Sequence, residues 1–219
     1  MQDAIIAHSV VVQVARNSAL YRVGDEVVGL YAALAGDLRI YVYAEGNERI
    51  FLRPLGPTAW FGDIHLLNGH PHRTFEVWSA TQSAVLFLPR AGYETITRDP
   101  DAYRRFVNLA CLHAVHATRV VIEARADARV RTARALLRLA KAHGRHEPRG
   151  CELVMKLTQS DLASLVGVSR QFMNELIAAW NSEGRLIWES GARPVIALDR
   201  IEDLLTPLDH WIPDNPGWV

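Results

Sequence analysis

The amino-acid sequence predicts an α+β fold made of three consecutive parts: an N-terminal, jelly-roll-like β-roll, a long helix and a C-terminal winged helix-turn-helix. Three observations predict it. Short β-branched and aromatic runs fill the first part of the chain, a long helical pattern follows them, and two short amphipathic helices joined at a glycine precede a hairpin near the end. We place the three parts at residues 1–100, 101–126 and 127–219.

The first part, from about Ser9 to Pro89, alternates strand-like runs with turn residues such as Gly24, Gly36 and Gly46. Many short strands at this spacing favour a barrel or a sandwich. The expected strands are residues 10–14, 20–23, 29–34, 38–43, 49–52, 75–78 and 84–88.

Between Phe61 and Pro71 the strand pattern lapses, and the sequence predicts one short helical turn. Arg73 and Thr74 follow at once. Because a helix N-terminus and a nearby guanidinium both attract anions, this segment is a candidate anion site. An arginine at the start of a strand is equally typical of an ordinary surface salt bridge.

From about Pro100 the chain becomes helical, with Asp101 as the expected cap. The apolar stripe of this helix is too long for one small β-domain to cover, so we expect the helix to pair with that of a second copy. Packing only against its own roll is the alternative. The stripe consists of Phe106, Ala110, His113, Ala117, Val120 and Ala124. A second helix, Ala128–Ala142, is expected to begin at the cap Asp127, and a linker is expected over residues 145–150.

The segment Leu157–Ile187 predicts two helices that meet at Gly167. Thr158 and Asp161 have the spacing of a capping box, and Ser169 can cap the second helix. Ala163 stands where the helices cross and only a small side chain fits. The buried stripe of the second helix is expected to contain Phe172, Met173, Leu176 and Ile177.

The opposite face of the second helix carries Arg170, Gln171, Asn174 and Ala178. A helix fits the major groove of DNA, where Arg and Gln make paired hydrogen bonds to guanine and adenine. An ordinary helical hairpin in a protein core is the alternative. A predicted hairpin with a turn at residues 190–194 follows as the wing, and Asp199 is expected to cap a short helix through Leu205.

Composition and charge limit the class of protein that this sequence can encode. The 219 residues carry zero formal net charge, but residues 131–198 hold ten Lys and Arg against six Asp and Glu, a modest electrostatic footprint for a DNA-binding protein. The two cysteines, Cys111 and Cys151, have no zinc-site spacing and are expected to be reduced.

No apolar run approaches the roughly 18 residues that a membrane span needs. With no signal-peptide pattern at the N-terminus, we expect a cytoplasmic protein.

A β-roll, a long helix and a winged helix-turn-helix in this order resemble the CRP/FNR family of bacterial transcription regulators, over nearly the whole chain. Residues 168–175 are similar to the recognition helix of that family, and residues 183–187 to the start of its wing. Asp127 and Arg131 match the start of the helix after its interdomain hinge. The spacing of its cyclic-nucleotide-binding roll is met by Gly24, Gly36, Gly62 and Arg73.

The resemblance implies a homodimer that binds a palindromic double-stranded DNA operator and contacts RNA polymerase, without catalytic residues or enzyme activity. Gln171 stands where the family usually has Glu, and Glu175 where Arg is common. Because Gln pairs with adenine and Glu accepts from cytosine, we expect a shifted half-site consensus. The implied base contacts are Arg170, Gln171 and Glu175, with Asn174 on the same face, and the implied phosphate contacts are Thr158, Ser160 and Ser169.

The same resemblance implies an effector cassette for cyclic AMP (cAMP) or cyclic GMP (cGMP). Gly62 would let the backbone approach the phosphate, Arg73 and Thr74 would bind it, and Asp63 would hold the ribose 2′-hydroxyl. On the long helix, His116 and Ala117, or Thr118 in a shifted register, would meet the base. The chain departs from the family in having Asp63 in place of a Glu, the bulky Phe75 in place of a small residue, and no hydroxyl pair on the helix. A member that responds to no cyclic nucleotide is therefore the alternative.

Other ligands of such a protein depend on cysteine or histidine side chains. Two separated cysteines exclude the four-cysteine iron–sulfur cluster of some family members. A haem needs an axial histidine, for which the candidates are His65, His70, His72, His113 and His116. His70, His72 and Glu76 have the spacing of a cupin metal site, but no further His follows between Arg73 and Leu112, and a cupin does not explain the winged helix. We therefore expect no metal site.

Overall fold

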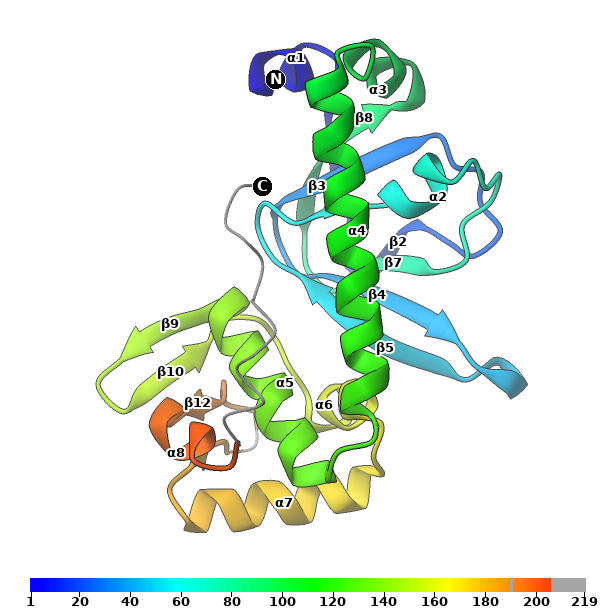
Figure 1. Ribbon diagram of the computed structural model, residues 1–219. Helices are drawn as coiled ribbons and strands as arrows, with labels where there is room; N and C mark the ends of the chain where they lie inside the picture. The colour runs from blue at the N-terminus through cyan, green and yellow to red at the C-terminus, as the bar shows by residue number, and fades with distance from the viewer. Residues whose placement is uncertain (190, 206–219) are drawn as a thin grey trace. The chain divides into compact units, whose positions relative to one another are not determined.

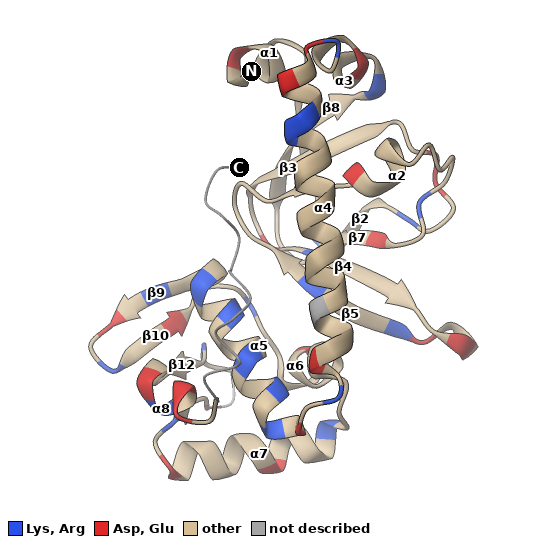
Figure 2. Cartoon of the chain, viewed as in Figure 1, with Lys and Arg blue, Asp and Glu red and all other residues tan. Residues whose placement is uncertain are grey.

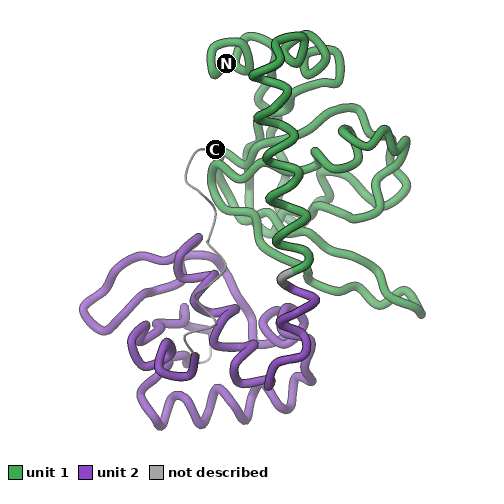
Figure 3. The backbone as a smooth tube through the Cα atoms, viewed as in Figure 1, with its two compact units in different colours: residues 1–119, 216–219 green, residues 120–215 purple. Residues whose placement is uncertain are grey.

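The structure is a computed structural model that describes residues 1–189 and 191–205, apart from the side chain of Arg119. Ser190 in the expected wing turn, and the C-terminal tail with Trp211 and Trp218, lie outside the described residues. The chain divides into two compact units, of which the first takes in residues 1–119 and the second begins at Val120 (Figure 3).

The first unit is a roll of two four-stranded sheets with antiparallel pairing (Figure 1). The jelly-roll-like β-roll predicted from the sequence is thereby confirmed. One sheet has the strand order β1 (Val10–Val14), β8 (Ser83–Pro89), β3 (Gly29–Ala35) and β6 (Trp60–Phe61). The other has the order β2 (Ser18–Tyr21), β7 (Glu76–Ser79), β4 (Leu38–Tyr43) and β5 (Arg49–Leu55).

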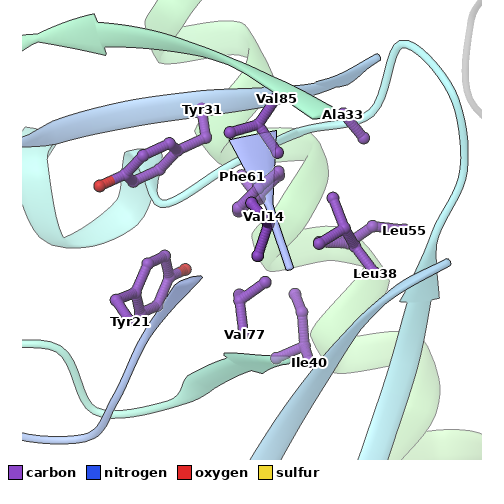
Figure 4. Packing of buried hydrophobic residues seen from close by; sticks show 10 residues of the cluster. All are labelled: Val14, Tyr21, Tyr31, Ala33, Leu38, Ile40, Leu55, Phe61, Val77 and Val85. Atoms are coloured by element: carbon purple, nitrogen blue, oxygen red, sulfur yellow. The ribbon is translucent and has the colours of Figure 1, made fainter. Parts of the chain in front are cut away.

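The core of the roll lies between the two sheets, where alternate residues of each strand point inward (Figure 4). Apolar side chains fill most of it, and the hydroxyl-bearing rings of Tyr21 and Tyr31 lie at one side. The buried members are Val14, Tyr21, Tyr31, Ala33, Leu38, Ile40, Leu55, Phe61, Val77 and Val85.

Helices pack on the outside of the roll. They include α2 (Asp63–Leu67), the expected helical turn, and α4 (Pro100–Glu123), the expected long helix. Two short helices that the sequence analysis did not foresee, α1 (Gln2–Ala7) and α3 (Arg90–Ile96), join a second buried cluster with the start of α4, and a 3-10 turn spans η1 (Glu45–Asn47). That cluster is Ile5, Val27, Leu30, Leu66, Leu88, Tyr93, Ile96, Ala102 and Phe106.

The residue that caps the start of α4 is Asp99 and not the expected Asp101. The helix begins at Pro100, and the side chain of Asp99 accepts a hydrogen bond from the backbone N–H of Asp101 (3.0 Å). Asp99 therefore occupies the position expected for Asp101, because proline is tolerated in the first helical turn, where no backbone N–H is needed.

The second unit contains three main helices and a four-stranded sheet with the order β11-β12-β10-β9. Its helices are α5 (Ala128–His143), α6 (Gln159–Val166), α7 (Arg170–Ser182) and the short α8 (Leu198–Glu202). Its strands are β9 (Gly144–Glu147), β10 (Gly150–Leu153), β11 (Leu186–Ile187) and β12 (Val195–Ile196). This arrangement confirms the predicted winged helix-turn-helix.

Two local expectations in the second unit are wrong. Residues 145–150 are not a linker, because they form most of β9, the turn after it and the first residue of β10. The hairpin of β9 and β10 joins the sheet of the second unit through the pairing of β10 with β12. Asp199 does not cap α8 but lies inside it, because the helix begins at Leu198 after Ala197. Asp127, by contrast, is confirmed as the cap of α5 and accepts from Arg129 N (2.8 Å).

Within the described residues, no helix is long and apolar enough to cross a membrane.

Candidate functional site

The helix-turn-helix is fixed by local hydrogen bonds that the sequence predicts. Thr158 Oγ1 accepts from Asp161 N (3.0 Å), and Asp161 Oδ2 accepts from Thr158 N (3.0 Å), which completes the capping box. Gly167 adopts a left-handed conformation with φ 72° and ends α6. Ser169 Oγ then accepts from Phe172 N (3.1 Å) and starts α7. The end of α6 and the start of α7 are thus set by residues within one short segment.

Helix α7 has one buried face and one exposed face. Met173 and Trp180 are fully buried, and Leu176 and Ile177 are almost so. On the other side the exposed residues are Arg170, Gln171, Asn174 and Glu175, together with Ser169 at the helix start and Thr158 and Ser160 at the start of α6. All seven residues expected to contact DNA are therefore on the solvent-exposed surface of the second unit.

Electrostatics on this face are mixed. Among the described residues, the guanidinium of Arg170 has no ion pair or hydrogen bond with another side chain, while the side-chain amide of Gln171 donates to Glu175 Oε1 (3.1 Å). Figure 2 shows several Lys and Arg positions along α5 and at the start of α7, and an acidic position within α7. The exposed face of α7 therefore carries free donors at Arg170 beside a hydrogen-bonded amide–carboxylate pair.

The wing is tied to the end of α7. Asn181 Oδ1 accepts from Trp188 N (2.9 Å), and Asn181 Nδ2 donates to Trp188 O (3.2 Å). Strand β11 pairs with β12, which in turn pairs with β10. The wing strands are therefore part of the sheet of the whole unit.

Arg131 is a structural residue whose contacts the sequence analysis did not foresee. Its guanidinium donates to Ala126 O (2.8 Å) and Ala124 O (3.3 Å) at the end of α4, and to Val166 O (3.2 Å) and Gly167 O (3.4 Å) at the helix-turn-helix. The planar fork of an arginine can reach several carbonyls at once. Arg131 thereby joins the segment before α5 to the turn that sets the position of α7.

In the first unit, the expected cassette residue Arg73 is buried, with 1% of its surface exposed. Its guanidinium donates to Gly62 O (2.9 Å) and Gly29 O (2.6 Å) and lies 4.5 Å from the ring centre of Tyr21. Burial raises the pKa of Tyr21 far above its ordinary value, and the nearby Arg73 only partly offsets this. Among the described residues, no carboxylate forms an ion pair with Arg73.

The other two polar cassette residues are also bonded to protein groups. Asp63, 3% exposed, lies 2.9 Å from Nδ1 of His113 on α4. Thr74 Oγ1 lies 2.7 Å from His65 Nε2, which also accepts from Thr74 N (3.3 Å). Burial lowers the pKa of His65, with the charge of Arg73 as a further cause, so the ring is held neutral. The structure therefore brings Gly62, Asp63, Arg73 and Thr74 together as expected.

On α4 the structure singles out a different residue from those expected. Thr118 is exposed and its hydroxyl donates to Ala114 O (3.0 Å) of its own helix, and His116 is partly buried. The residue of α4 that contacts Asp63 is His113, which the sequence suggested as a member of the apolar stripe and as a haem ligand candidate. Its helical position was visible in the sequence, but its partner lies 50 residues away in the chain.

One further charged group of this region was not foreseen. Arg53 on β5 is partly buried, and burial lowers its pKa, an effect that the neighbouring Asp63 and Tyr21 oppose. Its guanidinium makes no ion pair or hydrogen bond within the described part of the chain. Asp63 therefore has a cationic neighbour on the roll as well as a histidine on α4.

The residues considered for metals have other partners. Glu76 accepts from Arg49 Nη2 (2.5 Å) and from the hydroxyl of Tyr43 (3.3 Å), and His70 Nδ1 lies 2.6 Å from His72 O. No group of three or more His, Cys, Asp or Glu side chains in the described residues could hold a metal ion. Cys111 is exposed, Cys151 is buried, and both are free thiols.

A β-roll followed by a long helix and a winged helix-turn-helix with an exposed second helix defines a class of protein, the two-domain DNA-binding transcription regulator. Residues 11–99 match the family model of the cyclic nucleotide-binding domain, and residues 130–204 match that of the Crp-like helix-turn-helix domain. The chain belongs to the CRP/FNR family, whose members are transcription regulators rather than enzymes.

Three members with known function or structure share less than a quarter of their aligned residues with this chain. A regulator of Mycobacterium tuberculosis, described as a CRP-like cAMP-activated global transcriptional regulator, is 23% identical over 171 residues, which are 77% of this chain and 76% of that protein. Among solved structures, FixK2 of Bradyrhizobium japonicum aligns with a TM-score of 0.78 and 17% identity, over 90% of this chain and 96% of that one. The c-di-GMP responsive regulator CLP of Xanthomonas campestris aligns with a TM-score of 0.71 and 21% identity, over 90% and 97%.

Proposed function

We propose that this DNA-binding transcription regulator acts in the bacterial cytoplasm as a homodimer that reads a palindromic operator with α7 and contacts RNA polymerase from that site. The observation that carries the proposal is the exposed face of α7, where Arg170 has no side-chain partner among the described residues and Ser169 caps the helix. Helix N-termini and serine hydroxyls suit phosphate contacts, and a free guanidinium suits a guanine edge.

The operator contact is tested by measuring the affinity of the full chain for selected operator DNA and for unrelated DNA at one salt concentration. Arg170→Ala is expected to abolish the preference for operator while leaving the dimer intact. Arg16→Ala, which removes an exposed arginine of the first unit, is the matched control and is expected to change nothing. Unchanged operator affinity of the Arg170 variant would show that α7 does not read the DNA.

The dimer is proposed from the exposed apolar face of α4, which differs from the stripe expected from the sequence because Phe106 is buried in the first unit and His113 contacts Asp63. Val115, Val121 and Ile122 have 51%, 68% and 60% of their surfaces exposed, and Cys111 and Thr118 are exposed at the same helical spacing. Apolar side chains at this spacing on a long helix usually pack against a partner helix. A second copy of α4 about a two-fold axis would bury these residues against their own equivalents.

Cys111 makes this dimer testable without a new label. A short bismaleimide reagent is expected to link Cys111 to Cys111 of the second copy, because Cys151 is buried. Cys111→Ser is expected to remove the cross-link but leave the dimer intact in light scattering. Val121→Glu is expected to yield a monomer, since it places charges on the apolar face. A cross-link that is absent together with a monomeric mass for the unmodified chain would refute the dimer.

For the effector, we propose that the cassette is closed by the chain's own groups and that DNA binding needs no cyclic nucleotide. Arg73 is bonded to two carbonyls, Asp63 to His113, and Thr74 to His65. A cyclic phosphate would have to displace these partners before it gained its own hydrogen bonds. Each displaced buried group would lose about 1–3 kcal/mol unless the ligand replaced the bond.

Cyclic AMP or cyclic GMP as effector is the second candidate, and a specific observation favours it. Arg73 carries a buried charge without a carboxylate partner among the described residues, which is a costly arrangement that a phosphate would relieve. Calorimetry of the full chain with each nucleotide separates the two candidates. Binding at micromolar concentration supports the second, and no heat up to millimolar supports the first. A visible absorption spectrum of the purified protein tests haem in the same sample.

A further inference from the structure

Gln171 and Glu175 lie one helical turn apart on the exposed face of α7 and are joined by a hydrogen bond. The amide nitrogen Nε2 of Gln171 donates to Oε1 of Glu175 over 3.1 Å. Both side chains are exposed, and neither has another side-chain partner among the described residues. The helix beneath them is held by the Ser169 cap and by the buried Met173 and Leu176, so the pair stands on a fixed support.

The carboxylate determines how the amide of Gln171 is turned. An ionised carboxylate only accepts hydrogen bonds, so the NH₂ end of the amide must face Glu175 and the carbonyl end must face away. One N–H is used in this bond. The amide therefore presents one remaining N–H and its Oε1 for other contacts. Without Glu175, the same amide could rotate freely and present both N–H groups.

This pattern of one donor beside one acceptor matches a single purine. In the major groove, adenine offers the acceptor N7 beside the donor N6 amine, whereas guanine offers two acceptors, N7 and O6. A Gln171 amide held by Glu175 can bond both groups of adenine. Facing guanine, its Oε1 would meet O6, and two acceptors would repel each other.

We propose that Glu175 is a positioning residue that restricts Gln171 to adenine, so that the two side chains read one base pair as a unit. This inference rests on the proposed function, because it assumes that α7 enters the major groove. Glu175 is negatively charged and is repelled by DNA phosphates, so its presence on this face is not explained by overall affinity. A role in orienting the amide of Gln171 explains why Glu175 lies on the exposed face of α7.

The test uses the full chain and a pool of randomised duplex DNA from which bound sequences are selected and counted. The variant Gln171→Ala first identifies the base position that Gln171 reads, as the one position whose preference it removes. At that position, Glu175→Ala is expected to reduce the preference for adenine over guanine by about tenfold. Glu175→Gln keeps an acceptor for the Gln171 amide and is expected to retain most of the preference.

A charge effect alone predicts a different result. Removing the charge of Glu175 in either variant would then raise affinity for all sequences equally, without changing the preference at the base that Gln171 reads. That outcome, or loss of the preference in Glu175→Gln as well as in Glu175→Ala, overturns the proposal. An unmodified chain that selects no sequence at all would instead refute DNA reading by α7. The two failures are therefore distinguishable in one experiment.

Discussion

The Nδ1 atom of His113 lies 2.9 Å from the Oδ2 atom of Asp63, a contact that joins the long helix α4 to the first residue of α2. Both side chains are largely shielded from solvent, with 14% and 3% of their surfaces exposed. This contact connects a residue of the cassette directly to α4. Unfolding measurements on variants of this pair test whether the contact holds the cassette closed, as the effector proposal requires.

Replacing His113 by Leu is expected to lower the free energy of unfolding by about 2 kcal/mol, because it leaves the buried Asp63 carboxylate without its hydrogen-bond donor. Urea denaturation measures the loss. The double variant Asp63→Asn with His113→Leu is expected to lose less than the sum of the two single variants, since Asn carries no buried charge. Additive losses would show that the two residues do not interact.

His65 is expected to make the stability of the first unit depend on pH. Its pKa in the folded protein is lowered from 6.5 by burial, so the unfolded chain binds the proton more tightly. Stability is therefore present above pH 6.5 and is lost as the pH falls through 6.5 towards the folded-state value. Its Nε2 accepts from Thr74, a bond that a protonated ring could not make. His65→Gln is expected to flatten this part of the pH profile of unfolding, and an unchanged profile would assign the dependence to another group.

Gly62 and Gly69 provide a matched pair. Both have positive φ, at 80° and 71°, so alanine strains the backbone by about 1 kcal/mol at either position. At Gly69 an added Cβ meets nothing within 4 Å, whereas at Gly62 it would lie 2.9 Å from Nη1 of Arg73. Gly62→Ala is therefore expected to cost about 1 kcal/mol more than Gly69→Ala in urea unfolding, because it also disturbs the bond from Arg73 to Gly62 O. Equal costs would mean that the guanidinium moves aside freely.

Arg131→Lys is expected to weaken operator binding although α7 is untouched. A lysine keeps the charge but cannot reach the four carbonyls that the guanidinium of Arg131 contacts, so the turn at Val166–Gly167 loses its support. We expect a loss of about 2 kcal/mol in the stability of the second unit and a parallel loss of DNA affinity. The control is Arg129→Lys on the same helix, where the ion pair with Glu183 is exposed and contributes little. Equal effects of both variants would contradict this role.

Much of the second unit could be predicted from the sequence because its signals are local. The capping box of Thr158 and Asp161 spans four residues, and Gly167 and Ser169 fix the turn by their own backbone and side-chain preferences. The polar strand β9 was mistaken for a linker, because its strand character comes from pairing with β10 rather than from its own composition. The cap of α4 was placed two residues too late, at Asp101 and not at Asp99, because Pro100 can begin a helix.

The residues of the cassette could be predicted from the sequence, but their hydrogen-bond partners could not. Its residues were found from their spacing and from the family resemblance, and the structure does bring them together. Their partners were not foreseen: Arg73 bonds Gly29 across 44 positions, and Asp63 bonds His113 across 50. A sequence shows which groups can donate or accept, but it does not show which groups the folded chain places within 3 Å.

By itself, the sequence determined the order of the three parts, the caps and turn of the helix-turn-helix, and four of the residues that face outward on α7. These depend on helical periodicity and on hydrogen bonds between residues a few positions apart, which are the same in any surroundings. Only the tertiary structure decided that Arg73, Asp63 and Thr74 are bonded to protein groups and that Arg131 supports the turn before α7. Such contacts depend on the packing of distant segments, whose side chains compete for the same buried donors and acceptors.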